Sequence, residues 1–85
     1  MIKCYKKENY DDAWADYLVV DSDRIFGFDY FGDFDAWSAQ DDINGIKLQI
    51  EDGHYQLCSN QEILEQKAAW QLPPTVIAAL KMGWK

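Results

Sequence analysis

The sequence predicts a single domain of the α+β class, in which a small antiparallel sheet packs with three to four short helices. Its length of 85 residues suits one hydrophobic core, so residues 1–85 are expected to form one compact domain. Strand-like and helix-like patterns are mixed without regular βαβ units, which favours an antiparallel sheet. Turn signals then predict two hairpins, one near residues 18–30 and one near residues 46–58.

The N-terminal segment predicts a strand followed by a short helix. Residues 2–6 (IKCYK) alternate weakly between apolar and polar side chains, as a strand does. Asn9 is a suitable N-cap residue for a helix that begins after it. Four apolar residues then recur at the spacing of one helical face: Tyr10, Trp14, Tyr17 and Leu18. We therefore expect a helix here, with Glu8, Asp12 and Asp16 in a row on its surface.

The first predicted hairpin lies near residues 18–30. Residues 18–20 are apolar and partly β-branched, the following "DSDR" is typical of a turn, and residues 25–30 have the pattern of a second strand. Within that strand Phe26 and Phe28 share one face with Tyr30, so we expect them in the core.

The segment "FGFDYFGDFDAW", residues 26–37, contains six of the thirteen aromatic residues of the chain together with three aspartates. Phe34 and Trp37 share a face if Asp33 caps a short helix, and the neighbouring acids would then point outward. A core role is favoured for Phe34 and Trp37. The alternative is a binding hot spot, since aromatic side chains beside carboxylates are typical of interfaces.

The second predicted hairpin, "IKLQIEDGHYQLC", is built around Asp52-Gly53, a pair typical of a two-residue type I′ turn. With these two residues as the loop, Leu48 faces Leu57 and Ile50 faces Tyr55. Every apolar residue then has an apolar partner, so this register is expected to be specific.

The C-terminal third predicts two helices. Ser59 and Glu62 have the spacing of a capping box, and the helix that they open would turn four residues inward: Ile63, Leu64, Ala68 and Trp70. "LPP" ends that helix. Pro74 suits the first turn of the last helix and Gly83 the position just after it. The last helix is nearly all apolar, so we expect it to pack on the sheet.

The net charge of −7 is distributed very unevenly. Residues 1–7 carry three lysines and no acid, whereas residues 8–42 carry eleven acids against Arg24 alone. Residues 43–85 are balanced, with four acids and four lysines. Like charges repel, so a run of this kind lowers the stability of the fold. This cost suggests that the acidic half of the chain is retained for binding. The alternative is that the acids only improve solubility.

Several functional classes are disfavoured by the sequence. One histidine, His54, and two well-separated cysteines, Cys4 and Cys58, supply neither a nucleophilic triad nor a zinc site, and we expect both thiols to be free. The glycines form no phosphate-binding loop, and the aspartate pairs lack the remainder of a calcium loop. No apolar run reaches the ~20 residues of a membrane span, and the first residues lack the apolar core of a secretion signal. We expect a cytoplasmic protein that is not an enzyme and has no metal or cofactor.

These observations favour a non-catalytic inhibitor that docks on a basic protein surface, such as that of a nuclease or another nucleic-acid-binding enzyme, as a nucleic-acid mimic. Direct binding of nucleic acid is disfavoured by the charge. The residues expected to contact the partner come from the acidic half: Asp11, Asp12, Asp16, Asp29, Tyr30, Asp33, Asp35, Trp37, Asp41 and Asp42.

In size, acidity and aromatic content the chain is similar to small acidic phage anti-defence proteins, including anti-CRISPR proteins, and to immunity proteins against nuclease toxins. This is a likeness of general character, and it transfers no residue motif. Two alternatives remain open at this point: an accessory module of a larger complex, and an acidic, aromatic module that binds a ligand such as a carbohydrate. A catalytic role is third, with paired carboxylates such as Asp33 and Asp35 as acid and base.

Overall fold

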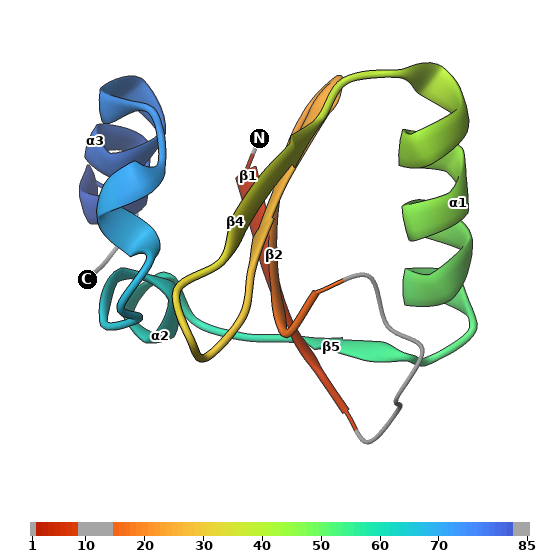
Figure 1. The fold of residues 1–85 in the computed structure, drawn as a ribbon, viewed down its shortest axis with the longest axis horizontal. Coiled ribbons are helices and arrows are strands. Elements are labelled where there is room, and N and C mark those ends of the chain that lie inside the picture. The colour runs from red at the N-terminus through yellow and green to blue at the C-terminus, as the bar shows by residue number, and fades with distance from the viewer. Residues whose placement is uncertain (1, 9–14, 83–85) are drawn as a thin grey trace.

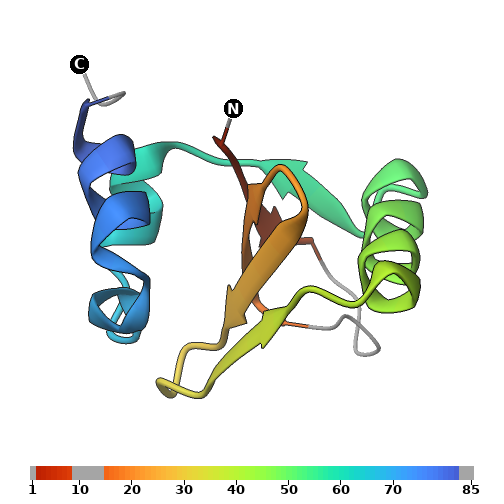
Figure 2. The ribbon, with the colours of Figure 1, turned by 90° about the horizontal axis from the view of Figure 1, so that it is seen from above.

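The computed structural model describes residues 2–8 and 15–82, which form three layers. A twisted sheet lies in the middle, α1 covers one face, and α2 and α3 cover the other (Figure 1). Seen from above, the helices stand on opposite sides of the strands (Figure 2). The class is therefore α+β, as the sequence predicts.

The sheet has five antiparallel strands in the order β4-β3-β2-β1-β5. The strand bounds are β1 Ile2–Lys7, β2 Tyr17–Asp21, β3 Arg24–Phe28, β4 Phe34–Trp37 and β5 Tyr55–Leu57. The helices are α1 Gln40–Glu51, α2 Asn60–Leu64 and α3 Pro74–Met82, with a 3-10 turn, η1, at Ala69–Gln71. The first four strands form a meander, and α1 then crosses the sheet from the β4 edge to the β5 edge.

The hairpin predicted near residues 18–30 is confirmed by the pairing of β2 with β3. Asp21 pairs with Arg24 across a two-residue turn, and the Arg24 guanidinium donates to Asp21 Oδ2 at 3.2 Å. Ser22, the first turn residue, has a φ of 52°, a value seen in the tight turns of hairpins. The strand predicted at residues 2–6 is also confirmed, as β1.

The central strands bury both faces, which explains their continuous apolar sequences. Tyr17 and Val19 of β2 lie on the face covered by α2 and α3, whereas Leu18, between them, lies on the α1 face. Phe26 and Phe28 of β3 follow the same alternation and enter the larger cluster. The prediction that Phe26 and Phe28 are core residues is confirmed.

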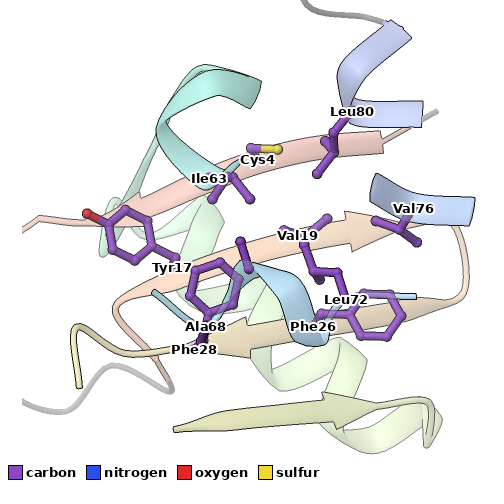
Figure 3. Packing of buried hydrophobic residues seen from close by; sticks show 11 residues of the cluster. Cys4, Tyr17, Val19, Phe26, Phe28, Ile63, Ala68, Leu72, Val76 and Leu80 are labelled. Carbon is purple, nitrogen blue, oxygen red and sulfur yellow. The ribbon is translucent and has the colours of Figure 1, made fainter. Parts of the chain in front are cut away.

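The larger cluster unites the sheet with the C-terminal helices. Figure 3 shows Ile63 of α2 and Val76 and Leu80 of α3 pointing toward the side chains of the strands. Phe34 packs against the same cluster, with its ring 6.4 Å from that of Phe28. The expected core role of Phe34 is thus observed, although it comes from a strand.

The predicted hairpin at residues 46–58 is wrong in its first strand, because residues 40–51 form α1. Ile43 and Ile46 recur at helical spacing and are buried against Leu18 and Ile25. Leu48, expected to face Leu57, is 59% exposed. Only the second strand is confirmed, as β5, and it pairs with β1.

Asp52-Gly53 ends α1 instead of turning a hairpin. Gly53 has a φ of +88°, its N–H donates to the Ile50 carbonyl at 3.2 Å, and the His54 N–H donates to the Gln49 carbonyl at 3.0 Å. This is the Schellman arrangement, which places glycine just after the last helical residues. Both structures require a glycine with positive φ, so the dipeptide alone does not distinguish them.

The short helix expected after Asp33 is also wrong, because residues 34–37 form the edge strand β4. Phe34 pairs with Phe28, and Trp37 pairs with Ile25. Phe34 and Trp37, which suggested one face of a helix, instead pack on opposite faces of the sheet. Gly32, with a φ of +101°, supplies the turn before the strand.

The helix predicted after Asn9 falls largely on residues 9–14, which lie outside the described residues. Its last expected members, Tyr17 and Leu18, belong to β2, so that part of the prediction is wrong. Their apolar side chains point to opposite faces of the sheet, where a helix would have placed both on one face.

The C-terminal region follows the sequence prediction in part, because the helix expected to run up to "LPP" ends at Leu64 and residues 69–71 form the separate 3-10 turn η1. Ser59 Oγ accepts from the Glu62 N–H at 3.1 Å and caps α2, and Pro74 is the first residue of α3. Ala68 is buried, but Trp70, expected inside, is 76% exposed. Gly83 lies outside the described residues. None of the helices in the described ranges has the length and apolar character that a membrane span requires.

Candidate functional site

The ten residues expected to contact a partner occupy several different environments. Asp11 and Asp12 lie outside the described residues. Asp16 is 9% exposed and its Oδ1 lies 2.7 Å from Lys7 Nζ, while its Oδ2 accepts from the Tyr30 N–H at 3.0 Å. The expectation that Asp16 is displayed on a helix is wrong: it is a buried tie between β1, β2 and the loop after β3.

Asp29 organises the turn between β3 and β4. Its Oδ1 accepts hydrogen bonds from the N–H groups of Phe31, at 2.9 Å, and Asp33, at 3.0 Å. Desolvation raises the pKa of the Asp29 carboxyl, but the N–H groups of Asp33, Phe31 and Gly32 outweigh it and hold the pKa below its ordinary value of 3.8. The carboxylate therefore has a structural role as well as a charge.

The turn that Asp29 organises presents two aromatic side chains, Tyr30 and Phe31, which we call the aromatic tip. Phe31 is 85% exposed, and the Tyr30 ring makes an edge-on contact with that of Tyr17 at 5.5 Å. The Gln71 amide donates to the Gly32 carbonyl at 3.1 Å and so ties this turn to η1. Trp70, also in η1, is largely exposed.

Phe31 and Trp70 were not among the residues predicted for the site. Phe31 follows Tyr30 in an aromatic segment that we assigned mainly to packing, and Trp70 was expected inside a helix. The exposure of Phe31 could have been predicted from its place in a turn, because a turn of five residues lies on the surface and has few side chains to cover an aromatic ring. No sequence pattern identifies the exposure of Trp70.

Four acidic side chains follow one another in the chain between the turn before β4 and the first turn of α1. Asp33 is exposed in the turn before β4, Asp35 is exposed on the edge strand β4 itself, and Asp41 and Asp42 follow in the first turn of α1. We call these four residues the acidic edge. Among the described residues none of the four takes part in an ion pair, whereas Asp16, Asp21 and Glu62 each contact a basic side chain.

Asp41 and Asp42 have a structural explanation as well. The N-cap residue of α1, Ala39, has no side-chain acceptor, so the first N–H groups of the helix point at neighbouring acids or solvent. Negative charge in the first turn stabilises a helix through its dipole, by roughly 0.3–1 kcal/mol. Asp33 and Asp35, in contrast, have no such role in a helix.

Trp37 lies at the same edge but serves packing. It packs half-buried against the α1-side cluster, and a methyl group added at Gly27 would come within 2.6 Å of its ring. Gly27 thus leaves the space that the indole occupies on the sheet. The structure brings together Asp29, Tyr30, Asp33 and Asp35 on one hairpin, with Trp37 as support.

An open hollow of about 330 Å³ lies between β1, β2 and the last turn of α1, with Lys3, Tyr5, Lys47 and Ile50 in its lining. No residue of the acidic edge lines it. Within residues 2–8 and 15–82, no three His, Cys, Asp or Glu side chains come close enough to hold a metal ion.

The two thiols are poor nucleophiles in this fold. Burial raises the pKa of Cys4 to about 12, with a further contribution from the neighbouring Cys58. Burial raises the pKa of Cys58 to about 11, and Glu62 adds to this effect. Thiolate is the reactive form, so both side chains are almost entirely protonated near neutral pH.

Comparison with known protein families, with curated proteins and with solved structures finds no match to this chain. The fold and the surface therefore define its class: a small α+β protein with an exposed acidic edge and an adjoining aromatic tip. Function has to be inferred from these features.

Proposed function

We propose that this protein is a non-catalytic antagonist that docks on a basic, nucleic-acid-binding surface of a target protein. The acidic edge is the contact surface, and it stands in for the phosphates of the nucleic acid. Asp33 and Asp35 are its central residues. The target class is a nuclease or another nucleic-acid-binding enzyme.

One observation carries this proposal: Asp33, in the turn before β4, and Asp35, on the edge strand β4, are both exposed and lack ion pairs among the described residues. Inward and edge charges protect a sheet from pairing with another chain, so one charge on β4 is explained by the fold alone. Asp33, in the turn before β4, has neither this explanation nor a place in a helix. A basic groove would supply counter-charges and so reduce the repulsion between the carboxylates.

The aromatic tip supports a protein partner over a small ion. An exposed aromatic side chain such as Phe31 contributes area at low entropic cost, and interface hot spots are enriched in aromatic residues. The edge would supply orientation and a fast association rate, while Phe31 and Tyr30 would supply apolar burial. Their position beside Asp29 and Asp33 makes both contributions available to one partner.

The proposal is tested by competition with nucleic acid. The full chain is immobilised, captured proteins from the native host are identified, and the purified partner is titrated with the chain in the presence and absence of duplex nucleic acid. We expect the partner to bind nucleic acid, and we expect the duplex and this chain to compete for it, so that the partner binds one or the other but not both. Simultaneous binding of duplex and chain would contradict the proposal.

The salt dependence of the same titration distinguishes the proposed antagonist from the alternative, an accessory module of a larger complex. Association through an acidic edge weakens steeply as salt screens the charges, whereas an interface built on Phe31 and Trp70 alone would change little. A tight complex that is insensitive to salt would favour the accessory module.

A further inference from the structure

The pairing of β1 with β5 brings the two cysteines opposite each other. The strands pair antiparallel with Tyr5 opposite Leu57 and Lys6 opposite Gln56. One step further along both strands places Cys4 opposite Cys58. A hydrogen bond from the Cys58 N–H to the Cys4 carbonyl, at 3.0 Å, holds Cys58 beside Cys4 just after the last residue of β5, Leu57.

Residues directly opposite each other in an antiparallel pair point to the same face of the sheet. Cys4 is buried in the cluster beneath α2 and α3, and Cys58 packs against that same cluster. Figure 3 shows the Cys4 side chain on this face, near Ile63 and Leu80. Both cysteines are free thiols.

The separation suits a disulfide bond. A directly opposed, hydrogen-bonded pair has a Cα–Cα distance of about 5.5 Å, and disulfides span about 4.4–6.8 Å between Cα atoms. Bridging Cys4 and Cys58 therefore requires side-chain rotation without a backbone rearrangement. At present Cys4 Sγ is turned toward Asn60, to whose Oδ1 it donates at 3.5 Å.

We propose that Cys4 and Cys58 are a site of reversible disulfide formation, which closes by exchange with a small-molecule disulfide and fastens the edge strand β5 to β1. The proposal is independent of the partner-binding function.

The reaction proceeds by two thiol–disulfide exchanges. Cys58 is the more accessible thiol, so its thiolate attacks the small disulfide first, forms a mixed disulfide and releases one small thiolate. Cys4, after losing its proton, attacks the Cys58 sulfur and releases the second small thiolate. The two protons from the cysteines end on the two small thiols, so the protein is oxidised by two electrons and the small disulfide is reduced.

The location gives the bond a definite effect. β5 has three residues and only one strand neighbour, so few backbone hydrogen bonds hold it. A bond at Cys58 would fix the point where the chain leaves β5 and enters α2. Because both thiols are strongly protonated near neutral pH, exchange is slow, and the open form persists where small disulfides are scarce.

The test begins with the full, reduced chain, incubated overnight under native conditions with oxidised glutathione. Remaining thiols are then blocked with N-ethylmaleimide in denaturant, and the intact mass is measured. We expect a monomer lighter by two hydrogen atoms that takes up no maleimide. Its melting temperature should rise by roughly 10 °C or more, because the bond encloses a long loop, and dithiothreitol should reverse the rise.

Cys4→Ser and Cys58→Ser serve as matched controls. Each retains one thiol, so oxidised glutathione should produce at most a glutathione adduct with no rise in melting temperature. In a second experiment the wild-type chain is oxidised in denaturant and refolded. The oxidised chain should regain the circular dichroism of the reduced chain and its higher melting temperature.

Two results would overturn the proposal. One is a native chain that yields only glutathione adducts or linked dimers, or that remains fully reactive toward maleimide after the overnight exchange. The other is a chain oxidised in denaturant that cannot regain the native spectrum or melts below the reduced form, which would show that the bond does not fit the fold.

Discussion

Asp16, Asp29 and Asp35 illustrate three different uses of an aspartate side chain in this protein. Asp16 is buried against Lys7, Asp29 accepts hydrogen bonds from the turn that follows it, and Asp35 is exposed on an edge strand. The sequence presents all three as similar acids in an acidic half. Their roles differ because of their tertiary partners. These partners lie far away in the chain or in a turn whose shape the sequence does not reveal.

Asp29 should make the fold sensitive to acid. Its pKa is lowered in the folded state, so its contribution to stability is present above the unfolded value of 3.8 and is lost as the pH falls through the folded pKa. Asp29→Asn keeps an oxygen acceptor but cannot titrate. We expect this variant to lose less stability than the wild type between about pH 7 and about pH 3, as measured by thermal melts.

Asp29→Ala completes this comparison, since it removes the acceptor altogether. It should melt at a lower temperature than Asp29→Asn at neutral pH, because the Phe31 and Asp33 N–H groups lose their partner. If both variants match the wild type at every pH, the hydrogen bonds of Asp29 do not hold the turn.

Three groups should make the fold sensitive to alkali. Burial raises the pKa of Cys4 and of Tyr17 to about 12 and that of Cys58 to about 11, whereas the unfolded chain ionises near 9.0 for thiols and 10.0 for tyrosine. Their contribution to stability is complete below about pH 9 and is lost as the pH rises toward about 12. Denaturant titrations across this range should show a steady decline.

The control is the double variant Cys4→Ser with Cys58→Ser. It retains only Tyr17 among the three groups, so its stability should begin to fall nearer pH 10.0 than 9.0. An identical onset in wild type and variant would show that the thiols are not the groups responsible.

At the scale of elements, local chemistry was predicted well where one signal has one meaning. Ser59 caps α2 and Pro74 opens α3, as the sequence indicates. Asp52-Gly53 has two meanings, a hairpin turn or a helix end, and alternating apolar residues in "IKLQI" made the hairpin attractive. The spacing of Ile43, Ile46 and Ile50 carried the correct signal, but Gly45 within that stretch lowers helix propensity and obscured it.

Two substitutions in α1 distinguish the helix from the predicted hairpin. Ile46→Ala should destabilise the protein by about 2–5 kcal/mol, because Ile46 is fully buried. Leu48→Ala should lie within about 0.5 kcal/mol of the wild type, because Leu48 is mainly exposed. Denaturant unfolding measures both, and a larger loss for Leu48→Ala would restore the hairpin register.

The edge strand β4 was missed for a related reason. Phe34 and Trp37 are three residues apart, which suits a helical face, yet in β4 they point to opposite faces of the sheet and both find cover. In a sheet that is covered on both faces, odd and even residues of a strand both find apolar neighbours. The sequence therefore cannot distinguish the two without knowing that a second layer of helices exists.

At the scale of the whole molecule, the charge asymmetry was the most informative sequence feature. It predicted that an acidic surface is displayed for binding, and for Asp33, Asp35, Asp41 and Asp42 that role stays a prediction. The edge itself depends on β4 being the last strand of the sheet, which follows from the topology. The aromatic tip depends on a turn whose side chains have no cover, and Asp16 is removed from the surface by Lys7. Neither outcome is encoded locally.

The central claim is that the acidic edge binds a basic partner, and charge reversal of Asp33 and Asp35 tests it most directly. Both side chains are exposed and form no ion pair within the described residues, so Asp33→Lys with Asp35→Lys should change stability by no more than about 0.5 kcal/mol per site. Glu51→Lys with Glu65→Lys changes the net charge equally, at exposed positions away from the acidic edge.

The measurement is the dissociation constant for the native partner at several salt concentrations, with melting curves to verify folding. Close charge pairs across an interface couple by roughly 1.5–7 kcal/mol, so the reversal of Asp33 and Asp35 should weaken binding by about 100-fold or more at low salt. The Glu51 and Glu65 variant should bind nearly as the wild type does. Equal binding by all three proteins would contradict the claim and leave the acidic edge a solvated surface.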